Sequence, residues 1–159
     1  MSKARWTMAI LSALLVLTAV LAPIGPMPGI WLSGANTPAP NSWGDTADVL
    51  EVKLQVGAGP LGRTVIIWVV QVDGDLYVTG QQDSGWVRGI GMQGPVRLQL
   101  RDTVYALHAT AVEDVAAAER VLIAWQDKYR QHYPDMIAQF PSAAEALQTG
   151  RAYRLTPRP

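Results

Sequence analysis

Residue types that carry most enzyme chemistry are sparse in this sequence of 159 residues. His108 and His132 are its only histidines, and neither stands at a ligand-type spacing from carboxylates. No cysteine is present, which excludes disulfides, thiolate metal ligands and thiol nucleophiles. No serine lies in a recognisable nucleophile motif such as GxSxG. The sequence therefore shows no catalytic constellation that would name a reaction.

The stretch from Arg63 to Arg88 is the strongest candidate for a binding site. It reads RTVIIWVVQVDGDLYVTGQQDSGWVR, with β-branched residues first, then the turn Asp73-Gly74-Asp75, then a second strand. Glycine tolerates positive φ without steric cost, so this turn favours a hairpin. A polar loop follows and ends on Trp86 and Arg88. We interpret this region as the place where a small barrel could hold a planar ligand.

Six strands and a few helices would position this stretch. Alternating apolar and polar residues predict strands over 50–56, 96–100 and 104–112. The apolar run 64–72 predicts a buried strand that pairs with 76–79, and a closing strand is predicted over 153–156. Asp114 can cap a helix over 115–131 that Pro134 ends. Ser142 and Glu145 form a capping box for a short helix that ends before Gly150. These elements predict a small antiparallel barrel with helices packed on its outside.

Three segments are predicted along the chain. Residues 1–35 have the layout of a secretory signal, because Lys3 and Arg5 precede an apolar run from Met8 to Ile24. Cleavage after Ala35 would release a secreted or periplasmic protein. Otherwise the segment stays as a membrane anchor, and its about 17 apolar residues are at the short end of what spans a bilayer. In both cases the domain faces the periplasm or the cell exterior. Residues 36–48, rich in Pro, Asn, Ser and Gly, are predicted to be a tether, and residues 49–159 the barrel domain.

The charge balance excludes one class of partner. The chain has thirteen basic and thirteen acidic residues. Since Lys3 and Arg5 lie in the leader, the remainder carries eleven basic against thirteen acidic residues. A protein that holds a nucleic-acid backbone needs a basic stripe, and the sequence has none. We therefore predict no nucleic-acid partner.

The order of these elements resembles that of the split β-barrel flavin-binding superfamily. The resemblance rests on the hairpin RTVIIWVVQVDGDLYV, the segment DSGWVR and the terminal GRAYRLTPRP, and it runs from Leu50 to Pro159. This superfamily includes pyridoxamine-phosphate-oxidase-like and deazaflavin-dependent nitroreductase-like proteins. The resemblance implies an α+β fold, a six-stranded antiparallel split β-barrel with one long and one or two short helices outside. An N-terminal hydrophobic helix would precede it.

The resemblance also implies a cofactor and an assembly. Members bind FMN or a deazaflavin in a groove at a dimer interface, which implies a homodimer here. An arginine offers a planar fork of donors to a phosphate, a threonine hydroxyl adds a neutral donor, and an indole can stack on a ring. The family's Gly-Arg-x-Ser-Gly turn is here Gly-Pro-Leu-Gly-Arg, without the serine. The positions that match the cofactor-binding residues are Arg63, Thr64, Trp68, Thr79, Gln81, Trp86 and Arg88.

Three functions remain open, and the first two come from different classes. The first is an exported or membrane-anchored oxidoreductase that binds FMN or a related flavin, with the cofactor carrying hydride transfer. The second is a non-enzymatic, membrane-tethered binding or scaffold module on the same barrel, which holds no cofactor or another small planar ligand. A third alternative is haem binding through His108 or His132.

Overall fold

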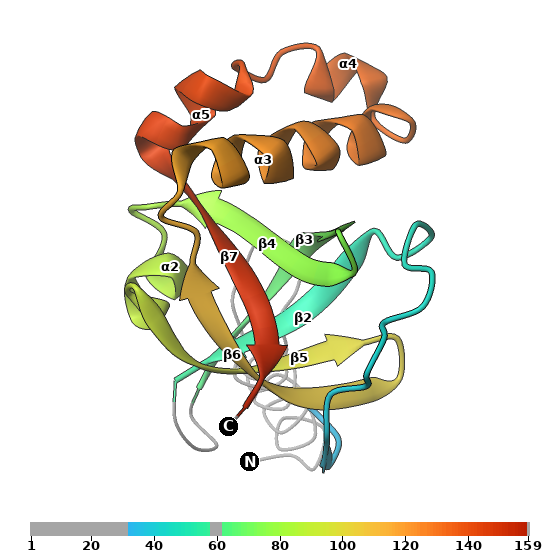
Figure 1. The fold of residues 1–159 in the computed structure, drawn as a ribbon. Coiled ribbons are helices and arrows are strands. Elements are labelled where there is room, and N and C mark those ends of the chain that lie inside the picture. The colour runs from blue at the N-terminus through green and yellow to red at the C-terminus, as the bar shows by residue number, and fades with distance from the viewer. Residues whose placement is uncertain (1–31, 58–61, 159) are drawn as a thin grey trace, which may run out of the picture.

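The computed structural model describes residues 32–57 and 62–158, and these form a closed antiparallel β-barrel with helices outside it (Figure 1). Around the barrel each strand pairs antiparallel with the next, and the last pairs with the first. The predicted six-stranded α+β barrel is therefore confirmed. In spatial order the strands are β2 (Glu51–Val56), β3 (Arg63–Val72), β4 (Asp75–Gln81), β7 (Gly150–Pro157), β6 (Thr103–Ala111) and β5 (Gln93–Leu100).

Alternation along the strands fills the barrel interior. In β2 the side chains of Val52, Leu54 and Val56 are buried in the barrel core, as the predicted alternation requires. The facing strands contribute the same pattern, with Val96 and Leu98 of β5 in register with Val56 and Leu54. The interior is consequently a packed hydrophobic core.

Residues before β2 lie against the barrel. Strand β1 (Asn36–Thr37) pairs in parallel with β6, at Val104 and Tyr105. The Trp43 ring packs edge-on against that of Tyr105, with centroids 5.1 Å apart. The segment predicted to be a tether thus contacts the domain at both places.

Three helices form one layer over the barrel (Figure 1). The long helix α3 (Val115–Arg130) packs on β3 and β7 and is followed by α4 (Pro134–Ile137) and α5 (Ala143–Thr149). The carboxylate of Asp114 caps α3 by accepting a hydrogen bond from the Ala117 N–H at 2.6 Å. The predicted capping box of Ser142 and Glu145 is also present at the start of α5. Both helix starts therefore follow from local sequence.

One local prediction was wrong. The stretch that ends on Trp86 and Arg88 was predicted to be a loop, but residues Gly85–Ile90 form helix α2. Trp86, Val87 and Ile90 point to one side of that single turn and join the barrel core, so burial stabilises a helix too short for its propensity to predict. The long helix ends before Pro134, as predicted. Pro134 also begins α4, because a proline at the first helical position lacks only an N–H that has no partner there.

Side chains of α3 hold β2 and β3 together where the two strands separate. Their pairing ends at Glu51 and Trp68. At the next position the Tyr129 hydroxyl accepts the N–H of Val69 at 2.9 Å, and it lies 2.5 Å from the carbonyl oxygen of Leu50, to which it can donate. A side chain thus replaces a direct bond between the strands.

Among residues 32–57 and 62–158, no helix is long and apolar enough to cross a membrane. The hydrophobic helix predicted at the N-terminus falls on residues 1–31, which lie outside the described part of the chain. Its prediction stays open.

Replacement of Gly80 by alanine should destabilise the barrel. A Cβ atom built at Gly80 would lie 2.2 Å from Cζ2 of the Trp86 indole, so the indole would have to move. Overpacking of this kind costs about 1–3 kcal/mol of unfolding free energy, measurable by urea denaturation. Gly94→Ala is the matched control, since its Cβ would meet its nearest neighbour at an ordinary 3.4 Å. Equal losses for both variants would contradict this packing.

The unfolding free energy should fall as pH rises past 10, and Tyr129→Phe should make that fall less steep. Burial raises the pKa of Tyr129 above its ordinary 10.0, so the unfolded state loses this proton first and gains about 1.4 kcal/mol per pH unit over the folded state. Burial lowers the pKa of Lys128, which makes stability rise with pH up to about 10.5 and opposes the tyrosine effect. Urea denaturation from pH 8 to 11 tests the difference, and identical slopes for the two proteins would refute it.

Candidate functional site

The helix α2 covers one end of the barrel interior with the indole of Trp86. This side chain is only 7% exposed, contacts Gly80 of β4 and lies 5.9 Å from the Tyr153 ring. The Tyr153 hydroxyl donates a hydrogen bond to the Gly91 carbonyl oxygen, just after α2, at 2.7 Å. Trp86 was predicted to stack on a cofactor ring. In the structure the barrel core surrounds it.

Arg63 and Arg88 both belong to the end of the barrel where α2 lies. The guanidinium of Arg63, at the start of β3, lies against Gly85, the first residue of α2, because a Cβ atom built there would be 2.9 Å from Cζ and Nη1 of Arg63. Arg88 lies on α2 and is exposed. Neither arginine has an acidic partner within the described ranges. Of the predicted residues, these two present free charge at the surface.

Thr64 and Trp68 are engaged by other side chains of the protein. The Thr64 hydroxyl is fully buried and accepts a hydrogen bond from the Gln55 amide at 3.3 Å. The Trp68 ring stacks on Tyr129 and Tyr133 under α3 and α4, with centroids 4.2 and 5.2 Å apart. Thr64 is next to Arg63 in β3 but is buried, whereas Trp68 packs under the helix layer.

Thr79 and Gln81 border a small cleft between the helix layer and the barrel. We call it the helix cleft, and its volume is about 210 Å³. Sequence reasoning missed most of its walls, since they come from four separate elements and carry no common motif. The cleft is lined by Thr79, Gly80, Gln81, Leu122, Trp125, Gln126, Phe140, Ala146, Gly150 and Arg151.

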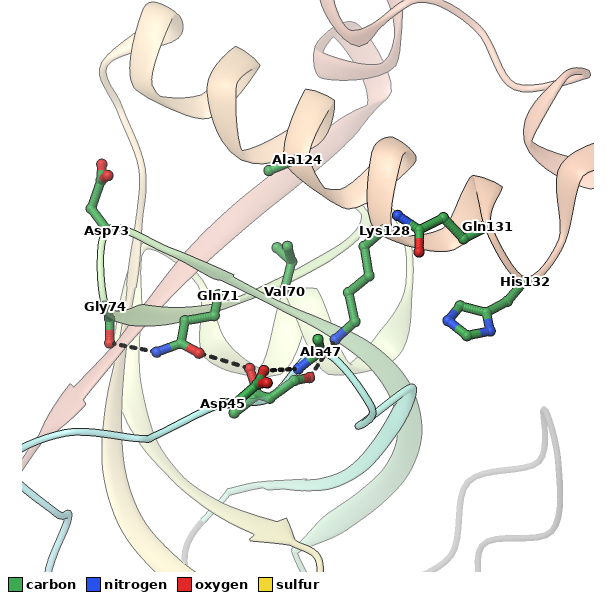
Figure 2. A pocket seen from close by; sticks show the side chains of 11 residues that line it. Asp45, Ala47, Val70, Gln71, Asp73, Gly74, Ala124, Lys128, Gln131 and His132 are labelled. Atoms are coloured by element: carbon green, nitrogen blue, oxygen red, sulfur yellow. Dashed lines mark hydrogen bonds between the residues drawn. The ribbon is translucent and has the colours of Figure 1, made fainter.

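A second, larger cavity of about 370 Å³ lies beside Lys128, between the end of α3 and the segment before β2 (Figure 2). The Lys128 ammonium donates to the carbonyl oxygens of Thr46, Val49 and Val69 at 3.0, 2.7 and 3.0 Å. All three of its N–H donors are thereby used, and burial lowers its pKa. Lys128 therefore holds the segment before β2, and strand β3, against α3. It has no donor left for a ligand.

The polar groups across this cavity are likewise engaged. The Gln71 side chain accepts the Thr46 hydroxyl at 2.9 Å and donates to the Gly74 carbonyl oxygen at 3.3 Å (Figure 2). His132 lines the cavity and is exposed. His108, the other histidine considered for haem, lies on β6 far along the chain and lines neither cavity. In the part of the chain that is described, no three acidic, histidine or cysteine side chains gather as metal ligands would.

The closed six-stranded barrel with an outer helix layer defines a split β-barrel protein. Residues 44–150 match the family described as "Uncharacterized protein conserved in bacteria (DUF2255)", and the chain belongs to that family. No curated protein matches it.

Solved structures share the fold. A conserved hypothetical protein from Mycobacterium tuberculosis superposes with a TM-score of 0.53 at 17% identity, over 80% of this chain and 87% of that one. A putative pyridoxamine 5'-phosphate oxidase from Listeria innocua gives 0.50 at 12% identity, over 70% and 86%. At these identities the likeness concerns the fold, and it confirms the split-barrel resemblance noted in the sequence.

Proposed function

We propose that this protein binds FMN or a related flavin at the α2 end of its barrel and acts as an oxidoreductase. The observation that carries the proposal is the pair Arg63 and Arg88, which place two guanidinium groups beside α2 without acidic partners in the described structure. A guanidinium presents a rigid fork of donors that matches the oxygens of a phosphate. The fold of the putative pyridoxamine 5'-phosphate oxidase from Listeria innocua supports a cofactor of this class.

The residues present fit the phosphate end of a flavin better than its ring. Arg63 and Arg88 would hold the phosphate, and the amide of Gln81, exposed at the end of β4, would donate or accept at its edge. The bound flavin would supply hydride transfer, while the barrel supplies binding and orientation. The indoles of Trp68 and Trp86 are packed on protein rings, so neither is placed to stack on the flavin.

A second copy of the chain would supply the missing wall of the groove. The resemblance implies a flavin bound between two subunits, and one α2 surface alone is exposed on its outer side at Arg88 and Gly89. We therefore include a homodimer in the proposal. Analytical ultracentrifugation with and without FMN measures this assembly directly.

The alternative is a non-enzymatic binding module on the same barrel. It is favoured by the engagement of Thr64, Trp68 and Trp86, three of the seven residues that match flavin-binding positions, within the protein itself. A barrel that has lost its cofactor would fill the vacated space with its own side chains, because protein interiors are close-packed.

Titration of the purified protein with FMN, followed by flavin fluorescence, separates these functions. We expect binding that Arg63→Gln and Arg88→Gln each weaken about ten- to hundredfold, because a lost charge-assisted hydrogen bond costs about 1.5–3 kcal/mol. Arg120→Gln, an exposed arginine on α3, is the control and should leave the affinity unchanged. A protein that takes up no FMN at millimolar concentration would reject the flavin and favour the binding module.

We also propose that the domain faces the periplasm or the cell exterior, exported through residues 1–35. Protease added to intact cells or spheroplasts should therefore degrade the domain, whereas a cytoplasmic control protein survives. A carbonate wash of membranes then separates the two fates of the leader, since an anchor stays with the lipid and a cleaved protein is released. Complete protection from the protease would overturn export.

A further inference from the structure

The first described residues of the chain are bound to the outside of the barrel. Arg97 of β5 lies between Val96 and Leu98, which are buried in the barrel core, so its side chain points outward. Its guanidinium donates to the Gly34 carbonyl oxygen and to the Asn36 side chain, each at 2.7 Å. Asn36 also begins strand β1, which pairs with β6. The chain is therefore fixed to this side of the barrel from Gly34 onwards.

Little chain separates this attachment from the predicted leader. The apolar run ends at Ile24, and the ten residues from there to Gly34 span about 35 Å at most when fully extended. A free tether over 36–48 would have added about 45 Å. A leader that stays in a membrane consequently holds the β1 side of the barrel close to the lipid. At so short a distance a weak attraction to the headgroups is enough to dock the domain, because a short link raises the effective concentration into the millimolar range.

Two arginines without acidic partners lie on this side of the barrel. Arg158, which follows β7 and is exposed, donates to the carbonyl oxygens of Leu107 at 3.2 Å and Val96 at 3.3 Å. It therefore reaches the residue that precedes Arg97. Neither arginine pairs with a carboxylate in the described ranges, and β1, β5, β6 and β7 contain no aspartate or glutamate. We call the surface around Arg97 and Arg158 the arginine face.

The helix layer carries the opposite charge. Residues 113–149, which comprise its three helices and the cap of α3, contain six acidic and three basic residues. Figure 1 shows the blue start of the described chain and the end of β7 at the bottom, whereas the helix layer lies at the top. The charge of the domain is thus divided between two ends. A surface of anionic lipid headgroups attracts the arginine face and repels the helix layer.

We propose that the leader is retained as an anchor and that the arginine face docks on the anionic phospholipid headgroups of the membrane that the leader enters. The helix layer then faces the aqueous side. This proposal rests on one of the two fates of residues 1–35 given above, the uncleaved anchor. It does not depend on flavin binding, because it uses Arg97 and Arg158, whereas the flavin proposal uses Arg63 and Arg88.

A single fluorescent label reports the orientation, since the chain contains no cysteine that would compete for it. Pro157→Cys places the label beside Arg158, and Ala116→Cys places it on α3, both at exposed positions. The full chain is reconstituted in vesicles of phosphatidylcholine and phosphatidylglycerol that contain a lipid with a quencher on its headgroup. We expect quenching of the label at position 157 to exceed that at position 116 about twofold or more. The difference should shrink in vesicles without phosphatidylglycerol and in about 1 M salt, because both weaken the attraction.

Charge variants locate the effect. Arg97→Gln and Arg158→Gln should each lower the ratio of docked to undocked domain about fivefold, the contribution of one arginine near an anionic surface. Arg120→Gln, at an exposed position on α3, is the control and should leave the ratio unchanged. If Arg97→Gln loses its fold by circular dichroism, Arg158→Gln decides the proposal.

Two results would overturn the proposal. Equal quenching at positions 157 and 116 in vesicles with phosphatidylglycerol would refute docking through the arginine face. A protein isolated from its own cells that begins at Asn36 by mass spectrometry would refute retention of the leader. Loss of FMN binding leaves both measurements unaffected, so a failure of the flavin proposal is distinguished from a failure of this one.

Discussion

The attachment of α3 to the separation of β2 and β3 is the contact on which the rest of the structure depends. Two adjacent residues of the helix, Lys128 and Tyr129, supply donors and an acceptor to backbone groups at Val69, Val49 and Leu50 that the strands leave unpaired. Buried backbone groups without hydrogen-bond partners destabilise a protein. Strands β2 and β3 can therefore separate at this point because side chains of α3 supply the missing partners. The position of α3 then fixes everything that is built on the helix layer.

The large aromatic side chains lie in two hydrophobic clusters, one inside the barrel and one between the barrel and the helix layer. Trp68 lies on the outer face of β3 and stacks on tyrosines of the helix layer, whereas Trp86 lies inside and fills the space that Gly80 leaves. Each indole stabilises the protein by removing apolar area from water. Both rings therefore contribute to the packing of the protein itself.

The groups that remain available to a ligand are arginine side chains without an acidic partner in the described ranges. Arg63 lies against Gly85 and Arg88 lies on α2, and neither has an acidic partner in the described ranges. The α2 end of the barrel and the helix cleft share strand β4, because Gly80 contacts Trp86 and also lines the cleft.

The sequence by itself determined those features that depend on residues close along the chain. Alternation gave the strands, Asp73-Gly74-Asp75 gave the hairpin, and Ser142 with Glu145 gave the start of α5, because strand periodicity, turns and caps are local. Only the tertiary structure decided that residues 85–90 become a helix, and that Trp125, Phe140 and Arg151 line one cleft. These outcomes depend on contacts between segments tens of residues apart, where burial outweighs local propensity.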